Sequence, residues 1–229
     1  VHFTLFGIPV YIRPSFWVVL AIFGGALSIS SVEDLIYPAL FVIAGFVAIL
    51  SHEMGHALVG RKLGGGQQTI VLELFGGLTS SHGMQLTRGG RALMILAGPM
   101  MTLLLGIISL GLTWNIVAPV MTSYNLNFWD LAISPFTAAL ISPKLYILSC
   151  LIMIGEWWTI LNLLPIYPLD GGQLIAQYIR SPRKVFMTGF ITAILIGLLS
   201  FQLFHGYFIP IFMALFAYSN YREYKNAPF

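Results

Sequence analysis

Six stretches of mostly apolar residues constrain this chain more than any other feature, because each has about the length that a helix needs to cross a lipid bilayer. They cover residues 15–30, 36–60, 92–114, 145–164, 185–204 and 207–221, approximately. Only 8% of the 229 residues are charged, against roughly 25% in soluble domains. A soluble fold of this size would leave much of that apolar surface in water. We therefore predict an all-α polytopic membrane protein with six transmembrane helices, in contact with the lipid bilayer.

The basic residues predict how these spans are oriented. With six spans the loops alternate between two sides, and of the 11 Lys and Arg residues only Lys144 falls on one of them. Basic residues favour the cytoplasmic side, so we expect both termini in the cytoplasm. The net charge of +3 is small and no basic run is present, which argues against nucleic acid as a partner. We expect residues 1–229 to form a single domain.

The cytoplasmic segment between the second and third spans is neither a span nor an ordinary loop. A β-branched run that starts at Thr69 is followed by Gly76 and Gly77 and then by a second extended run. This order is typical of a β-hairpin. We predict a membrane-associated hairpin at about 69–81, with a plain interfacial loop as the alternative.

The second span contains the sequence His52-Glu53-Met54-Gly55-His56. Histidines at positions i and i+4 lie on one helix face, where both imidazoles can bind one metal ion. Glu53 can reach a water at that metal without being a ligand, which is the HExxH arrangement of zinc hydrolases. Ionisable residues inside an apolar span are rare and usually functional. The alternative is a polar network between helices that holds no metal.

A tetrahedral zinc site with one open position needs a third protein ligand. The remaining acids in or near the spans are Glu73, Glu156 and Asp170. Asp170 follows Pro165 and Pro168, which end the fourth span. Non-helical backbone at membrane depth is tolerated only where protein or a water-filled cavity surrounds it. A broken span that ends in Asp170 therefore suits a buried metal site.

Two motifs together resemble the signatures of the site-2 protease family of intramembrane zinc metalloproteases. One is the HExxH motif at 52–56, and the other is the Asn-x-x-Pro-x-x-x-Leu-Asp-Gly pattern of Asn162–Gly171. Residues 97–99 are similar to the family's third span, and the predicted hairpin is similar to its membrane-reentrant β element. Thr102 stands where the family often has Asn. The resemblance covers nearly the whole chain and is to compact microbial members, without PDZ or CBS domains.

The resemblance implies a fold, a metal and an activity. It implies one Zn²⁺ per chain, with His52, His56 and Asp170 as ligands and Glu53 as the general base. Asn162 is a candidate donor to the oxyanion, and the resemblance links the matching residue to substrate binding. The implied reaction is hydrolysis of a peptide bond within or near the membrane segment of a single-span protein.

The resemblance also implies the biological setting of that reaction. Release of a cytoplasmic fragment would belong to regulated intramembrane proteolysis, with an anti-sigma factor or a membrane-tethered transcription regulator as substrate. We expect an integral protein of the prokaryotic inner membrane. At about 1.5 Å per residue, the distance along the helix from Arg61 to the HExxH motif places the site about one third of the way into the membrane from the cytoplasmic side.

A substrate helix hides its peptide bonds in its own hydrogen bonds, so the substrate must bind as an extended strand. An exposed edge of the predicted hairpin is suited to bind that strand by β-augmentation. The residues predicted to pair with it are Ile70, Val71, Leu72, Glu73, Leu74, Phe75, Gly76 and Gly77.

Two other interpretations are compatible with a zinc motif in a membrane protein. A membrane zinc peptidase of another kind would use a later Glu as ligand, whereas the Leu169-Asp170-Gly171 segment favours Asp. A protein without protease activity, either a zinc-binding pseudoprotease that escorts membrane helices or a metal transporter, would not need Glu53. A transporter would also be expected to show repeat symmetry, and we find no internal repeat.

Overall fold

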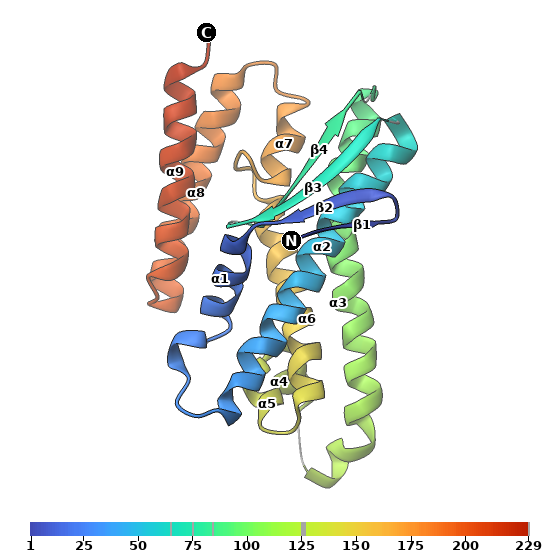
Figure 1. Cartoon of the computed structure of the whole chain (residues 1–229). Coiled ribbons are helices and arrows are strands. Elements are labelled where there is room, and N and C mark those ends of the chain that lie inside the picture. The colour runs from blue at the N-terminus through green and yellow to red at the C-terminus, as the bar shows by residue number, and fades with distance from the viewer. Residues whose placement is uncertain (65, 75, 84, 125–126, 229) are drawn as a thin grey trace. The chain divides into compact units, whose positions relative to one another are not determined.

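The computed structural model describes residues 1–64, 66–74, 76–83, 85–124 and 127–228. The chain forms two compact units, Val1–Thr159 and Ile160–Phe229. The first unit combines one small sheet with long helices, and the second is helical (Figure 1). The structure is therefore mostly helical, as predicted.

The first unit contains all the strands of the described residues and most of the helices. Its elements are β1 (His2–Leu5), β2 (Ile8–Ile12), α1 (Pro14–Phe23), the 3₁₀ turns η1 (Ala26–Ser28) and η2 (Glu33–Leu35), α2 (Ile36–Gly64), β3 (Gln67–Glu73), β4 (Gly76–His82), α3 (Arg88–Tyr124), α4 (Phe128–Ile133), α5 (Pro135–Ala139) and α6 (Pro143–Leu163). The second unit takes in the end of α6, followed by α7 (Asp170–Ala176), α8 (Pro182–Phe204) and α9 (Phe208–Asn226).

Four helices of the described residues are long and apolar enough to cross a membrane. They lie within Glu33–Gly64, Arg88–Pro119, Pro143–Leu163 and Pro182–Leu203 and correspond to the second to fifth predicted spans. The helix at the first predicted span, α1, has only 10 residues. The helix at the sixth, α9, has 19 residues and a polar C-terminal end with Arg222 and Lys225. The total of six spans therefore stays a prediction.

The structure differs from the sequence prediction after the third span. The third predicted span ended at residue 114, but α3 continues to Tyr124 and is followed by the short helices α4 and α5. Both short helices begin at a capping side chain, because Asn127 accepts a hydrogen bond from the Trp129 amide and Ser134 accepts one from the Thr137 amide.

The strands form one sheet in the order β1-β2-β3-β4. The pairs β1–β2 and β3–β4 are antiparallel, whereas β2 and β3 run parallel with Val10 opposite Ile70. Alternate residues face the core, as expected for a strand with one buried side. The buried side packs against α1 and α2 in a cluster of Ile8, Val10, Ile12, Phe16, Leu20, Ile49, Met54, Ala57, Ile70 and Leu72. This packing fixes the sheet beside the half of α2 that carries the HExxH motif.

The sheet topology corrects the predicted substrate-pairing edge. Ile70, Val71 and Leu72 were expected to offer an open edge, but each pairs with β2 on one side and with β4 on the other. The prediction is wrong for these residues because β3 lies inside the sheet. Glu73 pairs with Gly76, Leu74 lies in the turn, and Phe75 lies outside the described residues. Gly76 and Gly77 belong to β4, which is an edge strand of this sheet.

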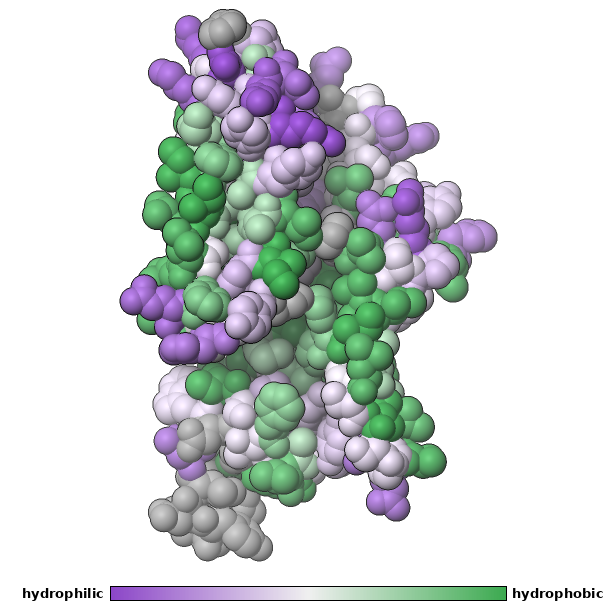
Figure 2. Space-filling view, turned by 90° about the vertical axis from the view of Figure 1, so that its left-hand side faces the viewer, coloured by the Kyte–Doolittle hydropathy of each residue, from purple (hydrophilic) through white to green (hydrophobic). Residues whose placement is uncertain are grey.

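The surface of the molecule exposes many large apolar side chains. In the second unit, Leu195, Leu198 and Leu215 are each more than half exposed. Figure 2 shows hydrophobic side chains over much of the visible face, with hydrophilic residues at its upper end and in smaller groups at both sides. Exposed apolar area on this scale is characteristic of a surface that contacts lipid or protein. Together with the long apolar helices, it supports an integral membrane protein.

Candidate metal centre

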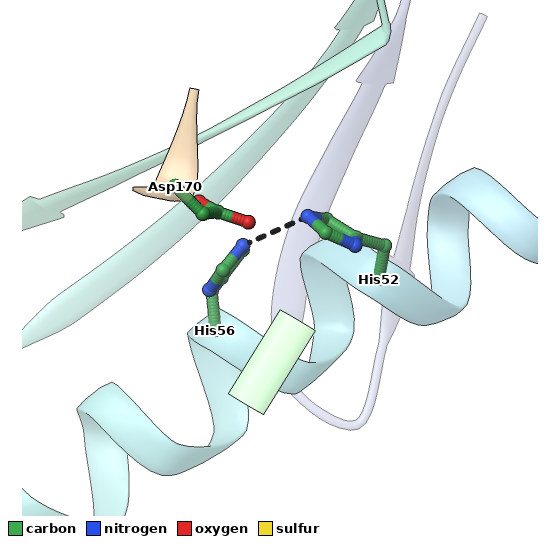
Figure 3. A group of neighbouring side chains, drawn as sticks. All are labelled: His52, His56 and Asp170. Carbon is green, nitrogen blue, oxygen red and sulfur yellow. Dashed lines mark hydrogen bonds between the residues drawn. The ribbon is translucent and has the colours of Figure 1, made fainter. Parts of the chain in front are cut away.

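The two histidines of the HExxH motif lie one helical turn apart on α2 and face each other. His52 Nε2 and His56 Nε2 are 3.1 Å apart, and both side chains are buried. Figure 3 shows the two imidazole rings turned toward one another, with the dashed line joining these nitrogens. The predicted pairing of these residues on one helix face is therefore seen in the structure.

A backbone contact fixes the tautomer of one of these rings. His56 Nδ1 lies 2.8 Å from the carbonyl oxygen of Met94 on α3. A carbonyl oxygen can only accept, so Nδ1 carries the proton and donates it to this bond. The lone pair of a neutral His56 ring then lies on Nε2, the nitrogen that faces His52. Metal-binding histidines typically donate their other ring N–H to a carbonyl or carboxylate in this way.

The spacing of the two rings fits a shared zinc ion. Zn–N bonds of about 2.05 Å at a tetrahedral angle place two ligand nitrogens about 3.3 Å apart. The observed Nε2–Nε2 distance of 3.1 Å is close to that value. Two imidazole nitrogens of one helix are also a donor set that zinc accepts readily.

Gly98 of α3 leaves the space in which these rings lie. A Cβ atom built at Gly98 would overlap the His56 ring and would come within 2.9 Å of His52 Nε2. Helices that approach closely in membranes use small residues at such contacts. In the sequence, residues 97–99 were singled out only by their similarity to a family segment. The structure shows why a glycine is needed there, because Gly98 packs against both imidazole rings.

Glu53 lies between the histidines in sequence and is 4% exposed. Its Oε2 accepts a hydrogen bond of 2.7 Å from Thr79 Oγ1 on β4. Gly77, two residues earlier on the same strand, has no side chain, and a Cβ there would overlap the Glu53 side chain. The sheet therefore packs directly on the carboxyl group predicted to act as the base.

The second unit contains Asp170 and Asn162. Asp170, the third residue labelled in Figure 3, opens α7 and is 6% exposed. Asn162 lies near the end of α6 and is 8% exposed. Both side chains are thus withdrawn from solvent, as expected for residues of a buried site.

The segment that leads to Asp170 is fixed from within the second unit. It breaks the helix after Leu163, as the prolines predicted, and Asn220 of α9 donates a hydrogen bond of 2.6 Å to the carbonyl oxygen of Tyr167. The Asn220 side chain is buried and also donates to the carbonyl oxygen of Phe216. Nothing in the sequence drew attention to Asn220, because its contact with Tyr167 joins distant parts of the chain.

Comparison with known proteins identifies similar chains. The model of peptidase family M50 matches residues 40–204. The zinc metalloprotease MJ0392 of Methanocaldococcus jannaschii is 29% identical over 227 residues, which cover 94% of this chain and 57% of the relative. The protein sll0528 of Synechocystis sp. is 28% identical over 188 residues, which cover 77% of this chain and 43% of the relative. The chain thus spans about half the length of these relatives.

A solved structure has a similar fold. The site-2 protease from Methanocaldococcus jannaschii aligns over 98% of this chain and 94% of its own, with a TM-score of 0.59 and 24% sequence identity. At this identity the likeness concerns the fold. It extends over both units and therefore includes the segments that carry both predicted motifs.

Proposed function

This chain belongs to peptidase family M50, and from that premise we propose that it is an intramembrane zinc metalloendopeptidase. Its substrate is a single-span membrane protein, cleaved within or near the transmembrane segment. The observation that carries the proposal is the facing pair of His52 and His56, with the His56 tautomer set by Met94, inside a long apolar helix. Imidazoles placed in this way in an apolar span are explained by a metal site.

The proposed ligands of a single Zn²⁺ are His52, His56 and Asp170. Each offers one donor atom of a kind that zinc accepts. The burial of all three side chains supports the assignment, because a buried carboxylate needs a partner of opposite charge. The family match spans the positions of all three residues.

The chain's own residues then have separate roles in hydrolysis. When bound, zinc supplies a Lewis acid that makes water more acidic and polarises a peptide carbonyl. Glu53 accepts a proton from the attacking water and delivers it to the leaving amine. Asn162 donates a hydrogen bond to the oxygen of the scissile carbonyl as negative charge develops there.

The membrane setting completes the proposal. The basic residues favour cytoplasmic termini, which places Arg61 on the cytoplasmic side of a prokaryotic inner membrane. The distance along the helix from Arg61 to the HExxH motif then places the site about one third of the way into the membrane from that side. Cleavage there releases a cytoplasmic fragment. We propose an anti-sigma factor or a membrane-tethered transcription regulator as the substrate, because releasing its cytoplasmic fragment would change transcription.

The proposal is tested by measuring bound zinc and cleavage in the same preparations. We expect one zinc per chain, cleavage of a single-span substrate, loss of cleavage on chelation and recovery on adding zinc. Asp170→Ala should weaken zinc binding by about 100-fold, the upper end of the effects known for partners that only orient ligands. Asp34→Ala is the matched control, because Asp34 is exposed and its carboxylate accepts hydrogen bonds from the nearby amides of Ser30 and Ser31.

The outcomes separate the possible functions. Wild-type zinc affinity in Asp170→Ala would remove Asp170 from the ligand set. A chain that binds zinc but cleaves none of several single-span substrates would instead favour an escort or a transporter, which zinc uptake into liposomes would distinguish. Absence of bound metal in the wild type would contradict the proposal as a whole.

We further propose that the substrate strand pairs with the free edge of β4 (Gly76–His82). Among the described residues β4 pairs only with β3, and it packs on Glu53 through Gly77 and Thr79. A strand added to this edge would lie next to the strand that touches the base. Main-chain pairing of this kind gives affinity with little sequence preference.

This pairing predicts a period of two along the substrate. Replacing successive amides of a synthetic substrate by esters removes one N–H donor at a time. We expect KM to rise about fivefold at alternate positions only, because a net hydrogen bond is worth about 1 kcal/mol and alternate amides of a strand face its partner. Equal effects at all positions, or none, would count against pairing with β4. Ester substitution far from the scissile bond is the control.

A further inference from the structure

The hydroxyl of Thr79 contacts Glu53, and the proposed reaction assigns this contact no role. Thr79 Oγ1 lies 2.7 Å from Glu53 Oε2 and 3.2 Å from the Glu53 carbonyl oxygen. The hydroxyl has one proton, and the shorter distance and the negative charge favour the carboxylate as its acceptor. Thr79 therefore holds one oxygen of the carboxyl group, Oε2, while Oε1 lies beside Gly77.

The sheet register explains why Thr79 reaches this position. Thr79 pairs with Ile70, and Gly77 pairs with Leu72. Residues opposite one another in an antiparallel pair project to the same face, and Ile70 and Leu72 are fully buried on the face that packs against α2. Thr79 and Gly77 thus share that face, with Gly77 leaving room for the carboxyl group and Thr79 binding it.

We propose that Thr79 is a positioning residue for Glu53, an inference that rests on the proposed function. A glutamate side chain has several rotatable bonds, and ordering it costs free energy. The hydroxyl of Thr79 offsets that cost by holding the carboxyl group in one orientation before substrate arrives. Positioned bases react faster because little reorganisation remains to be done in the transition state.

The test compares Thr79→Val, which has nearly the same shape without the hydroxyl, with Thr79→Ser, which keeps it. We expect kcat to fall about 30-fold in Thr79→Val, within the range for a hydrogen bond to a charged group, and to stay within about threefold of wild type in Thr79→Ser. Zinc content should be unchanged in both. Substrate affinity, measured by comparing Glu53→Gln with Glu53→Gln/Thr79→Val, should also be unchanged.

The matched control is Thr113→Val. Thr113 is a buried threonine of α3 whose hydroxyl donates to the carbonyl oxygen of Ser109, so this variant should cleave like the wild type. A merely structural role for Thr79 would lower zinc content or substrate affinity together with kcat and would overturn the proposal. Unchanged kcat in Thr79→Val would also overturn it while leaving the protease function standing. A wild type without zinc-dependent cleavage would overturn both.

Discussion

Replacing Glu53 by glutamine is expected to lower cleavage of a single-span substrate by roughly 10²- to 10⁴-fold, the range that a general acid–base residue contributes, while bound zinc stays at one per chain. Glutamine has nearly the same size and cannot accept the proton of the attacking water. Its carbonyl oxygen can still accept the hydrogen bond from Thr79, so the local packing on β4 should persist. The measurement is initial cleavage rate beside zinc content in the same sample.

Because Glu53 is buried at the site, the control is a glutamate that is exposed and belongs to another element. Glu33→Gln removes an acid of the same type from the exposed turn η2 and should leave both quantities unchanged. If Glu53→Gln retained more than about a tenth of the wild-type rate, which is less than the loss expected for a base, Glu53 would not be the general base. Loss of zinc together with cleavage would instead indicate that Glu53 supports the metal.

Replacing Gly98 by alanine is expected to abolish detectable zinc binding and, with it, cleavage. A single added methyl group would occupy the space of the His56 ring and approach His52 Nε2. Both rings belong to buried side chains of α2, and α3 is packed against them, so neither can move aside without disturbing that packing. We therefore expect Gly98→Ala to weaken zinc binding more than Asp170→Ala does.

Gly111→Ala is the matched control for this substitution. Gly111 lies on the same helix, but a Cβ there meets nothing within 4 Å. Alanine favours a helix by about 1 kcal/mol over glycine, so both variants gain the same local preference and differ in what the new methyl group meets. Zinc titration and circular dichroism of both variants check the prediction. Wild-type zinc affinity in Gly98→Ala would contradict the role assigned to the ring space.

The sequence predicted those features that depend on neighbours along the chain. His52 and His56 face each other because they are one turn apart on a helix. The run from Thr69 predicted a strand because its β-branched residues favour one and Gly76 and Gly77 follow it. The same reasoning located the break before Asp170 from its two prolines. Each of these predictions needed only the period of a helix, the strand preference of β-branched residues or the geometry of proline.

Features that depend on distant residues were not predictable in this way. The parallel pairing of Val10 with Ile70 places β3 inside the sheet and so removed part of the expected substrate edge. Nothing near Thr79 in the sequence indicates that its hydroxyl meets Glu53, because the contact depends on the packing of β4 against α2. The length of α3 was missed because Pro119, a residue that usually interrupts a helix, lies inside this one.

The pairing of β2 with β3 has a consequence for how the chain is made. Residues 8–12 leave the ribosome well before residues 67–73, and all of α2 lies between them. The N-terminal hairpin must therefore wait until α2 has been inserted and the chain has turned back, since contacts between distant residues form only after the intervening loop closes. Glu53 is synthesised before β4, so its carboxyl group gains the contact with Thr79 only after residues 76–82 have been added and have packed on α2.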